Sequence, residues 1–203
     1  MLDSSLKILY VIGFVVGLVI RAVYTAGTRK TRIADDQETV LGKLLMTLSS
    51  LGLIILPFFY LLSSRLDFAD YHLPAWAALT AGIPGVAIFA FALWLLWRSH
   101  VDLGRNWLPM LQIREGHTLI TQGVYSHIRH PMYAAHLVWG IAQALLLQNW
   151  IAGLSMLVFF FPVYLFRAPR EERILIEHFG QEYRSYMNRT GRLIPITNRS
   201  SER

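Results

Sequence analysis

The sequence predicts an all-α, polytopic membrane protein with about five transmembrane helices, the last two forming a helical hairpin, plus a cytoplasmic loop and a C-terminal amphipathic helix. Of its 203 residues 54% are hydrophobic and 16% are charged. The mean hydropathy of +0.41 lies outside the usual range for a soluble domain. Long uncharged stretches also match the roughly 20 helical residues that cross a hydrocarbon core of about 30 Å. We therefore expect one membrane-embedded domain, with three spans in residues 1–98 and the chemistry in residues 99–203.

Each span is an apolar run without Asp, Glu, Lys or Arg. The first three runs are 8–20 (extendable through 22–26), 44–64 and 71–97. The last run, 132–166, is long enough for two helices if the chain turns at Gln148-Asn149-Trp150, which gives 132–147 and 151–166. Both halves are short, so the hairpin is expected to be tilted or to stop short of the far leaflet.

The amino-terminal run has to be distinguished from a signal peptide. Lys7 followed by 8–20 has the order of a charged and an apolar signal region. A cut after Ala26 would place Tyr24 where a small side chain is needed, so we expect a retained helix. The sequence has no cysteine, which excludes disulfides, thiolate metal sites and thiol catalysis.

Basic residues predict the orientation, because lysine and arginine near span ends stay on the cytoplasmic side. With five spans, Arg21, the first and third loops and the tail from Arg167 hold seventeen of the 19 basic residues. The opposite side has only Lys7 and Arg65, so the amino terminus is expected outside and the C-terminus in the cytoplasm. The net charge of +6 then reflects orientation and attraction to anionic lipid headgroups, and we expect no nucleic-acid partner.

The segment "GVYSHIRHPMYAAH" concentrates titratable groups where the fourth span begins. Proline favours the first helical turn, so Pro131 is expected to start the helix with His130 next to its cap. The free N–H groups of that turn would suit a carboxylate or phosphate. One polar or small stripe follows at helical spacing: Tyr133, His136, Gly140 and Gln143. The stripe could equally serve packing and hydrogen bonding between helices.

Arg167 directly follows the last apolar run. It stands four residues before Glu171, so the two share a face if the helix continues past Pro169. An exposed ion pair is the simple alternative. At the membrane boundary, however, the Arg167 guanidinium suits an anionic headgroup or a substrate carboxylate. We expect Pro169 to disfavour helix at Ala168, and the apolar face of 174–183 to form an amphipathic helix folded back on the interface.

Two motifs carry a family resemblance. "HTLITQGVYSHIRHPMY" followed by "EERILIEHFGQEYRSYMNRTGRLIP" resembles the isoprenylcysteine carboxyl methyltransferase family of integral membrane enzymes, over roughly residues 103–195. The resemblance implies S-adenosylmethionine as the cofactor and a lipophilic, prenylcysteine-like carboxylate as the acceptor. The implied substrate-binding residue is Arg167, and Arg167 and Glu171 are the implied catalytic pair. The implied cofactor-binding residues are Gln112, His117, Thr118, Leu119, Ile120, Tyr125, His130, Pro131, Met132, Tyr133 and Glu171.

The chemistry agrees with this assignment, because an ionised carboxylate needs no base to accept a methyl group and positioning supplies much of the rate. Three alternatives stay open. Methylation of a lipid amine would require a base, a small isoprenoid or fatty acid could be the acceptor, and related sterol reductases use NADPH. A metal site at His127, His130 and His136 has no acidic partner near the first two, so we expect no metal. A prokaryotic inner membrane is the expected location.

Overall fold

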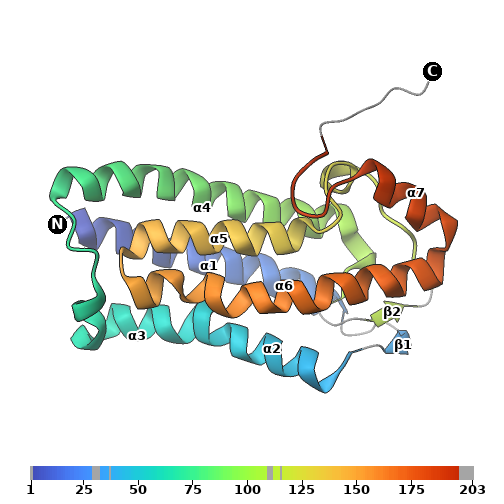
Figure 1. Ribbon diagram of the computed structural model, residues 1–203, viewed down its shortest axis with the longest axis horizontal. Helices are drawn as coiled ribbons and strands as arrows, with labels where there is room; N and C mark the ends of the chain where they lie inside the picture. Colours follow the sequence, from blue (N-terminus) through green and yellow to red (C-terminus); the bar gives the residue numbers. More distant parts are fainter. Residues whose placement is uncertain (1, 29–32, 37, 109–111, 115, 197–203) are drawn as a thin grey trace.

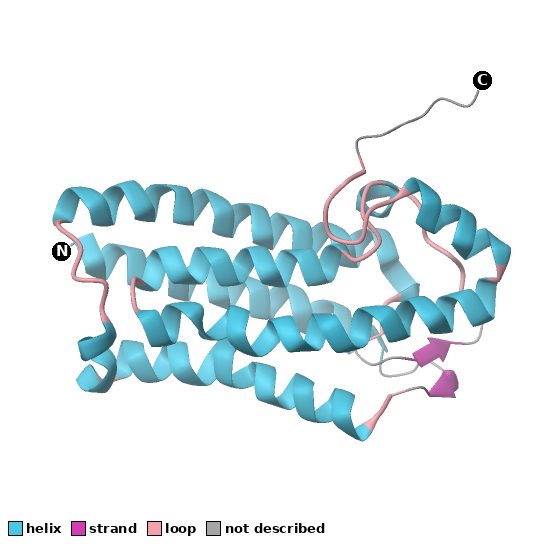
Figure 2. Ribbon diagram, in the orientation of Figure 1, coloured by secondary structure: helices cyan, strands magenta, loops and turns pink. Residues whose placement is uncertain are grey.

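The computed structural model describes residues 2–28, 33–36, 38–108, 112–114 and 116–196, which form an elongated helical bundle (Figure 1). The α-helices are α1 (Leu2–Thr28), α2 (Val40–Ser50), α3 (Leu56–Leu62), α4 (Ala75–Leu103), α5 (Pro131–Leu147), α6 (Trp150–Phe179) and α7 (Gln181–Arg189). A π-turn, η1 (Leu51–Ile55), joins α2 to α3, and short 3-10 turns are η2 (Ser64–Ala69), η3 (Gly104–Asn106) and η4 (Gly123–Ser126). Two short antiparallel strands, β1 (Ile33–Asp36) and β2 (Gln112–Arg114), were not expected (Figure 2).

Within the described residues, four helices are long and apolar enough to cross a membrane. They are Ser4–Gly27, Val40–Leu62, Ala75–Asn106 and Trp150–Phe179, and Pro131–Leu147 is a shorter apolar helix beside them. Large apolar side chains such as Val23, Ile83 and Val158 are exposed on their outer faces, as contact with lipid requires. The predicted all-α, polytopic membrane fold is confirmed, with α5 as the fifth, short helix.

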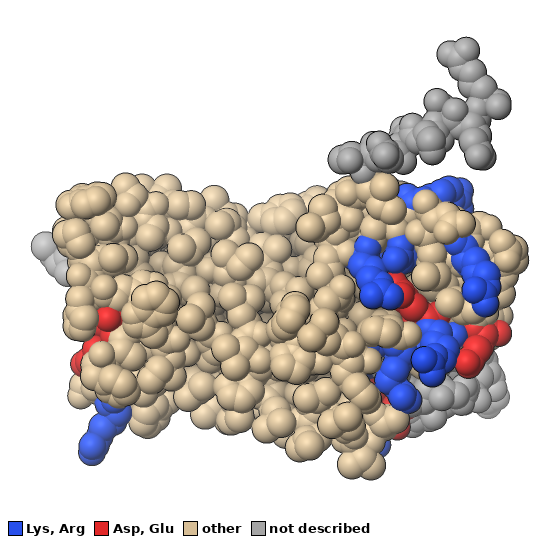
Figure 3. Space-filling view, in the orientation of Figure 1, with Lys and Arg blue, Asp and Glu red and all other residues tan. Residues whose placement is uncertain are grey.

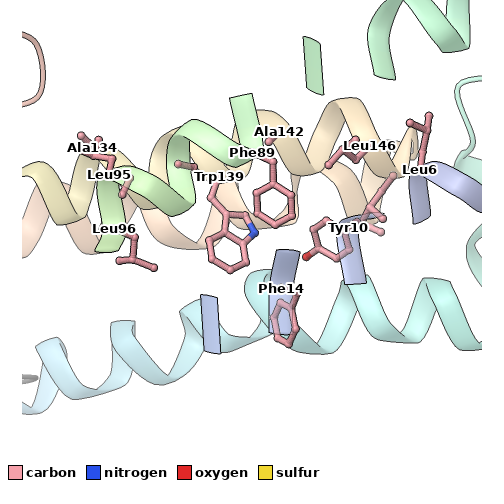
Figure 4. Close-up of a cluster of buried hydrophobic side chains, with 14 of the residues drawn as sticks. Leu6, Tyr10, Phe14, Phe89, Leu95, Leu96, Ala134, Trp139, Ala142 and Leu146 are labelled. Carbon is pink, nitrogen blue, oxygen red and sulfur yellow. The ribbon is translucent and has the colours of Figure 1, made fainter. Parts of the chain in front are cut away.

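The core lies between α1, α4 and α5. Trp139 of α5 packs edge-on against Phe89 of α4, with ring centroids 5.0 Å apart, and against Phe14 of α1 at 6.1 Å (Figure 4). Tyr10 stacks on Phe89 at 5.7 Å, so aromatic rings tie the three helices together at one level. The second group, α2 to α3 with α6, packs alongside α5 (Figure 1).

The second span contains a short π-helix, η1, which leaves one buried backbone carbonyl without a partner in its own helix. The Leu56 N–H bonds to the Leu51 carbonyl, and Pro57, the next possible donor, has no N–H. The Gly52 carbonyl is thereby left to accept from Gln143 Nε2 at 3.1 Å and from Ser155 Oγ at 2.9 Å. For Gln143, these bonds support the packing interpretation of the polar stripe. Gln143 links helices and does not line the cavity described below.

The hairpin between α5 and α6 turns where the sequence predicts. Gln148 adopts the left-handed conformation with φ of 49°, and the Asn149 side chain caps α6 by accepting from the Ile151 and Ala152 N–H groups. Asn149 also donates to Asp70 at 2.9 Å, which fixes the turn to the preceding connection.

Helix α6 corrects two expectations. It does not end near Phe166 but runs unbroken to Phe179, and Pro169 does not disturb helix at Ala168. A proline removes one backbone bond, and burial of Arg167, Ala168 and Glu172 on both sides of it holds the helix together. The first part of the face expected to fold back on the interface therefore continues α6, and the next helix, α7, begins only after Gly180.

The two ends of the bundle differ in charge. The amino terminus, the η2 connection and the α5–α6 turn lie at one end, and the β-strands, the loop before α5 and α7 lie at the other (Figure 1). Charged side chains gather at the second end (Figure 3). The loops are thus grouped as the sequence predicts, whereas the orientation across the membrane stays a prediction.

Candidate active site

A cavity of about 320 Å³ opens at the charged end of the bundle. Its walls come from α1, α2, α5, α6, α7 and the loop that leads into α5. The residues predicted from the sequence that line it are His117, Thr118, Leu119, Ile120, Tyr125, His130, Pro131, Met132, Tyr133, Arg167 and Glu171. Gln112 lies in β2, and its side chain is outside the described residues. The structure brings the other predicted residues together, and their individual roles stay predictions.

Helix α5 begins at Pro131, as the sequence predicts. His130 at its cap is buried, and its Nε2 lies 3.2 Å from Glu172 Oε1 while its Nδ1 lies 3.9 Å from Glu171 Oε2. The His130 side chain thus sits between two neighbouring carboxylates of α6. The Met132 N–H and the Tyr133 N–H are among the first-turn donors that an α-helix leaves without an internal partner, and both residues line the cavity.

Glu172 does not line the cavity but contacts two residues that do, Arg129 and His130, and the sequence did not single it out. Its carboxylate is 4% exposed and accepts from Arg129 Nε at 3.1 Å and from Arg192 Nε at 3.1 Å, in addition to its contact with His130. The backbone strengthens the same link, because the Arg129 N–H donates to the Gly191 carbonyl at 2.8 Å. Glu172 therefore ties the start of α5, helix α6 and the segment after α7 into one unit. The double glutamate in the quoted motif was the available signal, but only Glu171 stood four residues from Arg167.

Arg167 is 4% exposed and is paired with a carboxylate that the sequence did not suggest. Its Nη1 lies 3.0 Å from Glu38 Oε2, and the Glu38 side chain is 1% exposed. Glu38 directly precedes Thr39, the cap of α2, whose side chain accepts from the Gly42 N–H. Gly42 leaves space for this carboxylate, since a Cβ there would lie 2.1 Å from Glu38 Oε1. No local pattern connects Glu38 with α6, so only the fold reveals the pair.

Aromatic residues separate the Arg167 region from the loop. The Tyr133 side chain interacts with both Arg167 and Glu171, and its ring centroid lies 5.5 Å from that of His130. Tyr125 is buried, with its hydroxyl 3.4 Å from the Ser99 carbonyl and its own carbonyl accepting from the Tyr186 hydroxyl at 2.6 Å. Burial raises the pKa of Tyr125 well above its usual value and that of Tyr186 to about 12, so both are neutral phenols at pH 7.

The loop before α5 is fixed to the end of α4. Asn106 donates through Nδ2 to Thr118 Oγ1 at 2.9 Å, and the Thr118 N–H donates back to Asn106 Oδ1 at 3.1 Å. Asp102 accepts from the Val124 N–H at 2.9 Å, and a Cβ on Gly123, whose φ is 60°, would lie 2.1 Å from that carboxylate. Both contacts hold the predicted cofactor-binding segment against the cavity.

The three histidines considered as metal ligands have different surroundings. His127 is exposed and its Nδ1 lies 2.8 Å from Ser126 Oγ, whereas the His136 Nδ1 bonds to the Met132 carbonyl and its ring stacks on Phe160 at 4.7 Å. Within the described part of the chain, no group of three or more metal-binding side chains is found.

Comparison with known proteins bears on the same half of the chain. Residues 85–177 match the sequence model of the isoprenylcysteine carboxyl methyltransferase (ICMT) family. The predicted resemblance to the ICMT family is confirmed. The match to the family begins within α4, further toward the amino terminus than the motifs indicated, and it ends within α6, before α7 begins.

Curated relatives in the ICMT family are isoprenylcysteine methyltransferases by name. Protein-S-isoprenylcysteine O-methyltransferase B of Arabidopsis thaliana is 33% identical over 48% of this chain and 51% of its own. The Homo sapiens protein-S-isoprenylcysteine O-methyltransferase is 28% identical over 68% of this chain and 54% of its own. The Saccharomyces cerevisiae enzyme of the same name is 43% identical over 39% of this chain and 34% of its own. The chain therefore spans about half the length of the curated relatives that it matches.

A solved structure gives a further likeness. The eukaryotic intramembrane Ras methyltransferase ICMT aligns with a TM-score of 0.49 and 22% identity, covering 80% of this chain and 55% of that chain.

Proposed function

We propose that the chain is an S-adenosylmethionine-dependent methyltransferase that forms a methyl ester on the carboxylate of a lipophilic, isoprenylcysteine-like acceptor at the cytoplasmic membrane face. One observation carries the proposal: a single cavity is lined by a buried arginine, by an acidic residue and by the loop whose motif resembles the family's cofactor segment. The names of the curated relatives support the same reaction.

The donor side of the cavity suits S-adenosylmethionine by its chemistry. The exposed part of Glu171 can accept from an ammonium or a ribose hydroxyl, and the first turn of α5 can bind a carboxylate through its N–H groups. The rings of Tyr125 and Tyr133 can attract a sulfonium by about 0.5 to 2 kcal/mol through a cation–π contact. When bound, this cofactor supplies an electrophilic methyl group. The volume of about 320 Å³ lies within the range of small-molecule pockets.

The acceptor side combines a cation with an apolar wall. Met46 and Leu53 from the second span pack against the cluster that contains Met156 and Phe160 of α6, and all four side chains line the cavity. These side chains would contact a lipid tail, while Arg167 at the membrane boundary would orient the carboxylate. The neutral phenols of Tyr125 and Tyr186 are poor bases, which favours an acceptor that is already ionised over a lipid amine.

The reaction can be tested with purified protein in detergent. We expect an S-prenylcysteine acid, incubated with methyl-labelled S-adenosylmethionine, to yield a labelled methyl ester by mass spectrometry. Mild alkali should release that label as methanol, whereas methylation of a lipid amine would survive the treatment. Lipid extracts tested in parallel would reveal a small isoprenoid or fatty-acid acceptor.

Binding measurements separate this proposal from the reductase and metal alternatives. Titration with S-adenosylmethionine, NADPH and Zn²⁺ in turn should give tight binding with the first only. Tight binding of NADPH without binding of S-adenosylmethionine would overturn the assignment.

A further inference from the structure

Helix α1 carries a single charged residue within an otherwise uncharged stretch. Between residues 8 and 27 only Arg21 is ionised at neutral pH. A guanidinium at membrane depth is costly and is usually tied to a partner or a site. Its use as an indicator of membrane orientation does not explain why Arg21 stands inside this apolar run.

Arg21 faces the functional cavity together with Arg167. The two side chains are close enough to repel each other electrostatically. His100 and His136 also lie close enough to be affected by the charge of Arg21, and neither is an acid. Among the described residues, no carboxylate forms an ion pair with Arg21, whereas Arg167 has Glu38 at 3.0 Å. Of the three arginines that line the cavity, Arg129 and Arg167 thus face carboxylates, whereas Arg21 has no acidic partner among the described residues.

A simpler explanation is that Arg21 extends toward the membrane surface. It stands seven residues before the end of α1, which is about 10 Å along the helix axis at 1.5 Å per residue. An arginine can cover part of that distance with its flexible stem. Such an arginine would have no reason to favour a carboxylate acceptor over a neutral one, and this difference can be measured.

We propose that Arg21 is a second acceptor-binding residue, which holds the carboxylate of the lipophilic acceptor from the α1 side while Arg167 holds it from the α6 side. This inference rests on the proposed function and deepens it. Arg167 already has the Glu38 carboxylate 3.0 Å from its Nη1, so its positive charge is balanced in part before any acceptor binds, whereas that of Arg21 is not. The acceptor carboxylate would supply the negative charge that Arg21 lacks, and Arg21 would make the site selective for acids.

The test compares an N-acylated S-prenylcysteine with its methyl ester, which lacks the negative charge and carries one additional methyl group. Binding of both is measured for the wild type, Arg21→Gln, Arg21→Lys and the control Arg65→Gln, which removes an exposed arginine at the opposite end. We expect Arg21→Gln to weaken binding of the acid about 10- to 100-fold, as loss of a charged hydrogen bond predicts, and to leave the ester unchanged. Arg21→Lys should lose less, because it keeps the charge but not the bidentate geometry. Arg65→Gln should match the wild type.

Binding of S-adenosylmethionine reports whether each variant is folded. If Arg21→Gln does not fold, the acid-to-ester ratio of Arg21→Lys decides, with about a threefold or larger loss of preference expected. The inference is overturned if Arg21→Gln keeps the acid preference of the wild type, or if acid and ester weaken equally, since that is a structural effect. A wild type that shows no acid preference and forms no ester would instead refute the proposed function.

Discussion

Replacing each of two neighbouring glutamates of α6 by alanine should affect different properties, cofactor binding in one case and stability in the other. Glu171 faces the cavity with a side chain that is 36% exposed, and Glu172 is buried at 4% exposure among cationic side chains. We expect Glu171→Ala to weaken cofactor binding with little change in stability. Glu172→Ala should destabilise the whole protein.

The magnitudes follow from the contacts of each carboxylate. Removing Glu172 strands Arg129, whose side chain is 9% exposed, and breaking such a buried pair costs about 3 to 5 kcal/mol. Arg129 keeps its bond to the Met187 carbonyl at 2.9 Å, which places the expected loss near the lower end, about 3 kcal/mol. Glu171 has a 3.9 Å contact with His130 and an interaction with the Tyr133 side chain, and it is 36% exposed, so its removal should cost less than about 1 kcal/mol.

Unfolding followed by tryptophan fluorescence in one detergent, together with titration of S-adenosylmethionine, measures both effects. Glu171→Ala should raise the Kd for the cofactor by about 10- to 100-fold, the range of a charged hydrogen bond. Glu172→Gln serves as a control, because it keeps the shape and one acceptor and should lose less stability than Glu172→Ala. Equal destabilisation by the two alanine substitutions would refute this division of roles, and so would a Glu171→Ala variant with unchanged cofactor affinity.

Three further predictions address catalysis, packing and orientation. Arg167→Ala should abolish ester formation while changing the Kd for S-adenosylmethionine by less than about threefold; an equal loss of cofactor affinity would contradict its role as an acceptor residue. Gly52→Ala should lower the free energy of unfolding by about 3 kcal/mol, because the added Cβ would lie 2.3 Å from the Ser155 backbone oxygen. In the control Gly27→Ala, the added Cβ has no neighbour within 4 Å, so the free energy of unfolding should change by less than about 1 kcal/mol. In this cysteine-free chain, a membrane-impermeant maleimide added to intact cells should label Arg65→Cys but not Arg184→Cys. The reverse pattern would show that the chain has the opposite orientation in the membrane.

The sequence predicts the membrane helices well because hydropathy depends on the residues of one segment alone. It places the start of α5 at Pro131 and the hairpin turn at Gln148 for the same reason, since both are set by local backbone preferences. The spacing of Arg167 and Glu171 likewise predicts a shared face. Each of these features requires knowledge of a single helix or turn.

Features that depend on contacts between segments could not be predicted. The choice of Glu172 as the buried carboxylate depends on where Arg129 and Arg192 arrive, and the pairing of Arg167 with Glu38 depends on how α2 packs on α6. Pro169 misled the prediction in a similar way. A local penalty against helix was outweighed by burial on both sides of the proline, which the sequence alone does not show.

The length of α6 explains how one helix can serve both halves of the proposed reaction. Its 30 residues span about 45 Å at 1.5 Å per residue, which exceeds a hydrocarbon core of about 30 Å. Arg167 stands seventeen residues from its start, about 26 Å along the axis, and Glu171 follows one turn later. In the proposed function, the unbroken helix at Pro169 would place the acceptor-binding Arg167 near the boundary of the bilayer and the cofactor-binding Glu171 just beyond it. A kink there would change the distance between the two, so the proposed meeting of a lipid acid and a water-soluble methyl donor in one cavity depends on the continuity of α6.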